Sequence, residues 1–142
     1  MLPTPADHVA IADLLARYCL TLDVDDVEGW VALFTPDARY EVYGRSFDGH
    51  EGLRRMLAGA PGGLHLGGPP VIEMTAPDRA RTTRNLLFVA RRTGDGRSGE
   101  SRSAVYSDEL QRTADGWRIA HCRCRFIVAG GLGDRPDRQE GR

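Results

Sequence analysis

The amino-terminal part of the chain has the apolar pattern of an amphipathic helix. The apolar positions are three or four residues apart and lie at Ile11, Leu14, Leu15, Tyr18 and Leu22. Residues spaced in this way share one face of a helix. Thr4 followed by Pro5 is typical of a helix start, because threonine caps the first turn and proline fits its first position. The pattern therefore predicts a helix that begins after Thr4, ends at Asp23 and buries its apolar face.

Two shorter helices are predicted on either side of a strand. Residues 27–34 have the apolar spacing of a second helix, and Pro36 prevents that helix from continuing. Residues 37–43 predict a strand. Residues 49–57 predict a third helix, which again has one apolar face.

The rest of the chain has the pattern of long antiparallel strands. The predicted strands cover residues 64–75, 79–92, 101–112 and 117–128, the first of them bent near its Gly-Pro segment. Gly94-Asp95-Gly96 and Ala114-Asp115-Gly116 are typical hairpin turns. Helices followed by strands are characteristic of the α+β class. We therefore expect helices packed on one face of a bent antiparallel sheet.

Length and composition predict one domain. The chain has 142 residues, of which 41% are apolar, which is enough for a single core. We expect residues 1–129 to form this domain and the polar residues 130–142 to be a disordered tail. Nineteen basic and twenty acidic residues give a net charge of −1, which favours neither nucleic acid nor an anionic membrane as a partner.

Sequence signals favour a cytoplasmic protein with reduced thiols. The apolar runs are too short to cross a bilayer, and the amino terminus lacks the basic and apolar regions of a signal peptide. The cysteines are Cys19, Cys122 and Cys124. Their spacing fits neither a disulfide framework nor a zinc site, so we expect free thiols.

Asp23 and His65 are the candidates for chemistry. Asp23 falls at the carboxyl end of the first predicted helix, where the helix dipole disfavours a carboxylate. His65 lies between two glycine pairs at the start of a predicted strand. A carboxylate that orients an imidazole forms a general-base unit. From the residues alone, an ordinary helix-end aspartate and a structural histidine remain alternatives.

Several short stretches stand in a characteristic order along the chain. They are residues 11–18, Leu22-Asp23, residues 30–38, His65-Leu66-Gly67, Tyr106-x-Asp108-x-Leu110 and residues 115–119. In order and spacing they resemble the SnoaL-like proteins of the nuclear-transport-factor-2-like (NTF2-like) superfamily over residues 6–128. The resemblance implies a conical α+β barrel, in which a strongly curved antiparallel sheet wraps around the first helix and encloses an apolar pocket.

The resemblance also implies roles for particular residues. Scytalone dehydratase, bile-acid dehydratases and a hexachlorocyclohexane dehydrochlorinase carry an Asp and a His at the positions of Asp23 and His65. The bile-acid enzymes add a Tyr that matches Tyr18, which would polarise a substrate oxygen. The second pocket histidine of scytalone dehydratase is replaced by Arg84, which either supplies a cation to the substrate or neutralises Asp23.

The remaining candidates concern the pocket wall. The residues expected to bind substrate are Arg84, Tyr40, Trp30, Leu57 and Phe88. Tyr18, Tyr40 and Trp30 have core packing as an alternative role. His121 lies among arginines on a predicted strand, on either the outer face or the pocket side.

The implied function is a cofactor-independent lyase of the dehydratase type, or an isomerase, acting on a small apolar cyclic oxygenated substrate such as a steroid or polyketide. We expect no metal and no organic cofactor, because P-loop, dinucleotide and metal-ligand spacings do not occur. The resemblance implies self-association as a homodimer or homotrimer through the outer face of the sheet. The alternative is a non-catalytic binding or assembly module with the same fold.

Overall fold

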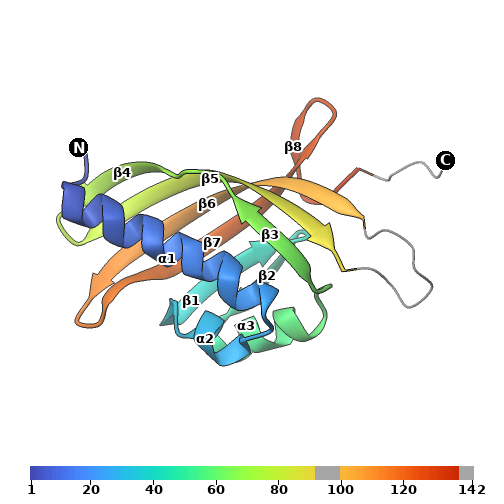
Figure 1. Cartoon of the computed structure of the whole chain (residues 1–142), viewed down its shortest axis with the longest axis horizontal. Coiled ribbons are helices and arrows are strands. Elements are labelled where there is room, and N and C mark those ends of the chain that lie inside the picture. Colours follow the sequence, from blue (N-terminus) through green and yellow to red (C-terminus); the bar gives the residue numbers. More distant parts are fainter. Residues whose placement is uncertain (92–99, 138–142) are drawn as a thin grey trace.

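The computed structural model describes residues 1–91 and 100–137, which form three helices and eight strands (Figure 1). The helices are α1 (Pro5–Asp23), α2 (Val27–Val31) and α3 (Gly49–Ala58). The strands are β1 (Phe34–Val42), β2 (Arg45–Asp48), β3 (Gly63–Gly67), β4 (Val71–Ala76), β5 (Arg79–Ala90), β6 (Ser101–Thr113), β7 (Gly116–Val128) and β8 (Gly131–Gly133). The predicted turn at Gly94-Asp95-Gly96 lies outside the described residues.

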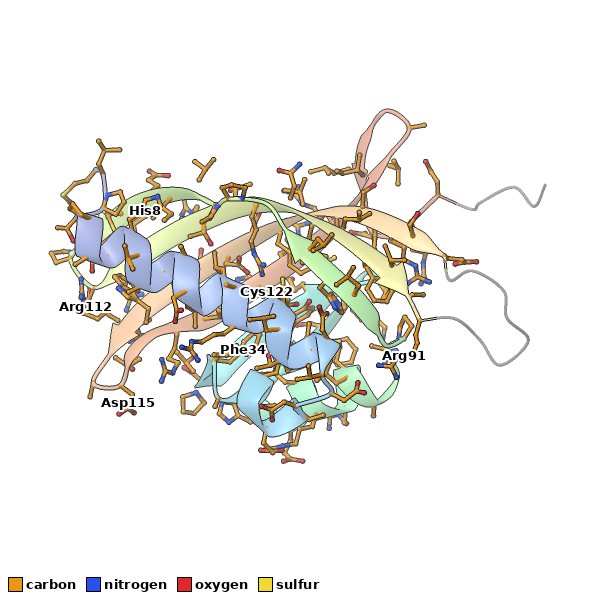
Figure 2. The ribbon with its side chains drawn as sticks, viewed as in Figure 1. His8, Phe34, Arg91, Arg112, Asp115 and Cys122 are labelled. Atoms are coloured by element: carbon orange, nitrogen blue, oxygen red, sulfur yellow. The ribbon has the colours of Figure 1, made fainter. Side chains whose placement is uncertain are left out.

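Helix α1 has the predicted bounds and buried face. Thr4 is extended, with φ −64° and ψ 159°, and its Oγ1 accepts a hydrogen bond of 3.1 Å from the backbone N–H of Asp7. The side chains that α1 buries include Ile11, Leu14, Leu15, Tyr18 and Cys19. Asp7 also pairs with Arg112 of β6 at 2.6 Å, which fixes the first turn against the sheet. Figure 2 shows Arg112 beside the start of α1. Asp23 is the last residue of the helix, as predicted.

The sheet is mixed and does not close. Its strand order is β2-β1-β7-β6-β5-β3, with β4 also paired to β5 and β8 to β7. The α+β class is confirmed, but the prediction of a wholly antiparallel sheet is wrong, because β1 runs parallel to β7. A turn signal in the sequence predicts only how two consecutive strands run relative to each other. It gives no information about β1 and β7, because these strands are far apart in the sequence. Since β2 and β3 lie at the two edges, the structure is a curved open sheet and not a complete barrel.

The second helix is shorter than predicted. It ends before Leu33, whose carbonyl oxygen accepts a hydrogen bond of 2.8 Å from the backbone N–H of Ile119. Phe34 therefore begins β1. Pro36 lies within this strand, in the stretch where the register against β7 shifts. A proline is tolerated there because the irregular ladder does not require its missing N–H.

Three further segments differ from the sequence prediction. The strand predicted over residues 64–75 is divided into β3 and β4 by Gly68-Pro69-Pro70, since two prolines cannot donate to a ladder. Strand β2 was not predicted and forms a hairpin with β1. Residues 131–133, which the sequence assigns to a disordered tail, form β8 beside the end of β7.

The two faces of the sheet are distinct. Along β5 the side chains alternate between exposed and buried, and the buried set from Ala80 to Phe88 faces α1. Helix α1 lies across the concave face, while α2 and α3 lie at one end of it (Figure 1). Each fully buried apolar side chain contributes about 1.5–3 kcal/mol to folding. Among the described helices, none is both long and apolar enough to cross a membrane.

Candidate active site

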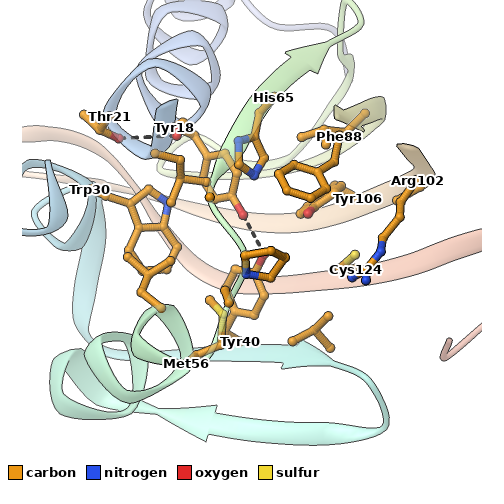
Figure 3. Close-up of a pocket in the computed structure, with 18 of the residues that line it drawn as sticks. Tyr18, Thr21, Trp30, Tyr40, Met56, His65, Phe88, Arg102, Tyr106 and Cys124 are labelled. Carbon is orange, nitrogen blue, oxygen red and sulfur yellow. Dashed lines mark hydrogen bonds between the residues drawn. The ribbon is translucent and has the colours of Figure 1, made fainter. Parts of the chain in front are cut away.

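A pocket of about 240 Å³ opens at the end of the sheet where α2 and α3 lie. Its wall combines aromatic, aliphatic and a few charged side chains from the helices and from both halves of the sheet (Figure 3). The predicted site residues that line it are Tyr18, Trp30, Tyr40, Leu57, His65 and Phe88. The pocket therefore gathers residues that are far apart in sequence around one apolar space.

Asp23 contacts His65, which lines the pocket, whereas Asp23 itself does not line it. Asp23 Oδ1 lies 2.8 Å from His65 Nδ1 and also accepts a hydrogen bond of 2.8 Å from the backbone N–H of His65. The side chains are 18% and 14% exposed, respectively. A carboxylate beside Nδ1 favours the tautomer that carries its proton on Nδ1. That tautomer leaves the lone pair of Nε2 available as a base.

The imidazole of His65 is also held by packing. Its ring centroid lies 4.8 Å from that of Phe88, with an angle of 45° between the planes. His65 on β3 and Phe88 on β5 are direct partners in the sheet register. Because Asp23 fixes one edge of the ring and Phe88 one face, the orientation of Nε2 is set before a ligand arrives.

Tyr18 and Tyr40 form a hydroxyl pair in the same pocket. Their Oη atoms are 2.5 Å apart, and both residues are buried (Figure 3). Burial raises the pKa of each phenol well above its ordinary value of 10.0, since the charged form would be desolvated. Two protonated hydroxyls joined by one hydrogen bond keep one proton to donate. The pair can therefore donate to a ligand oxygen.

Trp30 lines the pocket, but its indole N–H is buried. Its side chain is fully buried, and Nε1 has no hydrogen-bond partner among the described residues. A buried donor without a partner costs about 1–3 kcal/mol.

Arg84 does not line the pocket and does not neutralise Asp23. It is buried under the pocket, where Nε lies 3.5 Å from Asp108 Oδ2. Its guanidinium stacks over the rings of Tyr18 and Tyr106, at 4.6 and 5.1 Å from their centroids. Arg84 therefore neither binds substrate in the pocket nor neutralises Asp23. Instead, it balances the charge of Asp108 beneath the tyrosines.

Sequence reasoning missed Asp108 and the charged rim of the pocket. The alternation in Tyr106-x-Asp108-x-Leu110 was the available signal, because it directs Asp108 inward with its apolar neighbours. At the rim, Arg91 pairs with Asp25 at 3.2 Å. Arg102 also lines the pocket, and the sequence gives no signal that separates it from other strand arginines.

Two other candidates are unsuited to catalysis in this pocket: His121 lies outside it, and the thiol of Cys124 stays protonated. His121 does not line it and lies 2.7 Å from Glu41, Nε2 to Oε2. Cys124 lines it, but burial raises the pKa of its thiol to about 11. All three cysteines are free. Within the part of the chain that the structure describes, no three His, Cys, Asp or Glu side chains gather as a metal site requires.

Comparison with known families identifies the chain. The family of SnoaL-like domains matches residues 4–123, a span that contains both Asp23 and His65. The chain belongs to the SnoaL-like family. No curated protein matches it. Its curved open sheet is that of the NTF2-like, or cystatin-like, fold.

Solved structures similar to this SnoaL-like protein include proteins with and without a named activity. Rv3472 of Mycobacterium tuberculosis, of unknown function, is 30% identical over 89% of this chain and 81% of its own, with a TM-score of 0.78. A candidate scytalone dehydratase of Novosphingobium aromaticivorans is 20% identical over 96% and 95%, with a TM-score of 0.79. A hexachlorocyclohexane dehydrochlorinase is 18% identical over 96% of both chains, with a TM-score of 0.77. The last two share the fold at low identity.

Proposed function

We propose that this SnoaL-like protein is a cofactor-independent lyase of the dehydratase type, or an isomerase, with Asp23 and His65 as its general base. The substrate would be a small, apolar, cyclic molecule that carries oxygen. The observation that carries the proposal is the distance of 2.8 Å between Asp23 Oδ1 and His65 Nδ1 at the wall of an apolar pocket. The dehydratase and dehydrochlorinase among similar structures support it at the level of fold.

The first step is removal of a proton from carbon. His65 Nε2 takes the proton from the carbon next to a carbonyl group, and the electron pair of the C–H bond moves to the carbonyl oxygen. Asp23 stabilises the imidazolium that forms. The Tyr18–Tyr40 pair donates a hydrogen bond to the oxygen on which negative charge develops. Each of these groups is fixed before the reaction, so little reorganisation is needed.

The second step decides between the two reaction types. In a dehydration, the enolate electrons form the new C=C bond, the β C–O bond breaks, and the imidazolium gives its proton to the departing hydroxide. In an isomerisation, the same proton is returned to a different carbon. His65 is the only imidazole among the described pocket-lining residues. One imidazole therefore acts first as the base and then as the acid.

Deuterium exchange tests the proton-abstraction step without knowledge of the natural substrate. The probes are 2-tetralone and a steroid enone in D₂O, and NMR measures deuterium entry at the activated carbon. We expect the wild-type protein to accelerate exchange of at least one probe. His65→Ala and Asp23→Asn should each lower that rate by about 10²–10⁴-fold. His8→Ala, which removes an exposed histidine of α1, is the matched control.

The same experiment can reject the proposal. Retention of full exchange activity by a folded His65→Ala variant would show that His65 is not the base. The alternative function is a binding module, which is favoured by the absence of a second imidazole from the described pocket wall. It predicts that the probes bind, as seen by ligand line broadening, while wild type and His65→Ala exchange equally slowly.

We also propose that the protein forms a homo-oligomer through the outer face of its sheet. Leu64, Leu66 and Leu87 are 46%, 54% and 41% exposed. They lie on adjacent strands β3 and β5, with Leu66 directly opposite Leu87. An apolar strip of this kind is typical of a covered surface. Light scattering during size-exclusion chromatography would measure the mass, and a monomer at micromolar concentration would contradict the proposal.

A further inference from the structure

Three pocket residues form a straight row across the sheet. His65 on β3 is the register partner of Phe88 on β5, and Phe88 is in turn the partner of Arg102 on β6. All three line the pocket. Two strand spacings separate the ends of the row, so the backbones of His65 and Arg102 are about 10 Å apart. A flat ring that rests on Phe88 would have the imidazole at one edge and the guanidinium at the other.

The guanidinium of Arg102 is held in place by Tyr43. Arg102 Nη1 donates a hydrogen bond to Tyr43 Oη. The Tyr43 ring stacks on Phe126 at 5.3 Å between centroids and 28° between planes. Tyr43 has a φ of 56° in the tight turn between β1 and β2. Gly44 has a φ of 67°, so both loop residues have the positive φ that a two-residue hairpin turn requires.

The direction and burial of Arg102 suit an internal ligand. In Figure 3 its side chain extends toward Cys124, on the side of the pocket opposite Trp30. The side chain is 24% exposed, whereas that of Arg91 at the rim is 59% exposed. A less hydrated guanidinium forms stronger hydrogen bonds with an anion.

Among the described residues, the guanidinium of Arg102 has one long ion pair, with Glu100, and one hydrogen bond, to Tyr43. Asp25 is paired with Arg91, and Asp26 accepts the capping hydrogen bond of α2 from Gly29 N at 3.0 Å. The acidic group nearest to Arg102 among the described residues is Glu100. Its Oε2 is 3.7 Å from Nη2, beyond hydrogen-bond distance, and its side chain is 66% exposed. Arg102 therefore keeps N–H groups for a ligand.

We propose that Arg102 binds an ionised carboxylate on the substrate, so that the pocket takes an apolar ring acid. The carboxylate would accept hydrogen bonds from the guanidinium, while the ring lies on Phe88 and presents its far edge to His65. A planar carboxylate matches the fork of N–H donors that arginine offers. This inference deepens the proposed function, because it names the class of molecule that the same pocket would process.

Equilibrium binding of two matched probes tests the inference. The probes are 2-naphthoate and the neutral, equally shaped 2-naphthamide, measured by titration calorimetry at pH 7. Wild type should bind the acid about 10–100-fold more tightly than the amide, which is the factor supplied by hydrogen bonds between charged groups. Arg102→Gln should remove this preference, so that the acid and the amide bind with similar affinity. Arg81→Gln, which removes the same charge from an exposed position of β5, should keep it.

The possible outcomes separate this inference from the proposed chemistry. Equal binding of acid and amide by wild type, failure of both probes to bind, or survival of the preference in Arg102→Gln would overturn the inference. None of these results depends on turnover. Conversely, loss of the preference in Arg102→Gln would support carboxylate binding even if deuterium exchange proved independent of His65.

Discussion

Breaking the buried ion pair between Arg84 and Asp108 is expected to destabilise the fold by about 3–5 kcal/mol. The two side chains are 1% and 0% exposed, and Nε and Oδ2 are 3.5 Å apart. At that distance, with an effective dielectric constant of about 20, the attraction is about 5 kcal/mol. Asp108→Asn removes this attraction but leaves Arg84 desolvated. Most of the attraction should therefore appear as a lower free energy of unfolding.

Urea unfolding, followed by the fluorescence of Trp30 and Trp117, measures this loss. Thermal unfolding gives a second measure of the same loss. In a domain of this size, 1 kcal/mol shifts Tm by about 3 °C, so the Tm values of Asp108→Asn and Arg84→Met should each lie about 10–15 °C below that of wild type. The double variant Arg84→Met with Asp108→Leu removes both buried charges. It should be more stable than either single variant, because neither charge is left without a partner.

Two results would refute this reasoning. One is a loss below about 1 kcal/mol in both single variants, which would mean that the pair is solvated or weakly coupled. The other is a double variant destabilised by the sum of the two single losses, which would mean that the residues act independently. A single variant that fails to fold, together with a double variant that folds, agrees with the prediction.

Two further predictions follow from buried titratable groups. Because the folded pKa values of Tyr18 and Tyr40 lie above the unfolded value of 10.0, their contribution to stability is complete below pH 10.0 and is lost as the pH rises further. Urea unfolding from pH 9 to 11 should show this decline, and a double Tyr-to-Phe variant should show a smaller one, because burial also raises the pKa of Tyr106 and that residue remains; an equal decline in both proteins would contradict the prediction. Burial raises the pKa of Cys124 to about 11, so at pH 8 only about one thiol in a thousand is ionised. Iodoacetamide should label Cys124 slowly until urea unfolds the protein, and mass mapping that finds rapid labelling in the folded state would refute this.

Local sequence signals predict the first helix and the position of Asp23 at its carboxyl end. Thr4 and Pro5 define the start of α1, and the apolar period continues to Asp23, so these features need only the nearest neighbours in the chain. The position of His65 beside Asp23 required the resemblance to a family, because the two residues are brought together by the packing of β3 against α1. Short-range patterns contain no information about that packing.

The partner of Arg84 could not be predicted for a similar reason. Arg84 meets Asp108 because β5 and β6 pair in a register that places Thr82 opposite Asp108. Register depends on the whole sheet and the turn geometry, and a shift of one residue would move Asp108 to the outer face. The position of Arg102 beside Tyr43 could not be predicted either. It depends on a left-handed turn at Tyr43, and an aromatic residue gives no sequence signal for such a turn.

The parallel pairing of β1 with β7 has a consequence for synthesis of the protein on the ribosome. Arg39 and Tyr40 have their register partners at His121 and Cys122. A growing chain therefore exposes the apolar side of β1 until β7 has left the exit tunnel, and contacts of such long sequence separation form slowly. The pocket wall is completed last, after Asp23 and His65 have already been made. Truncation before β7 should leave a nascent chain that depends on chaperones.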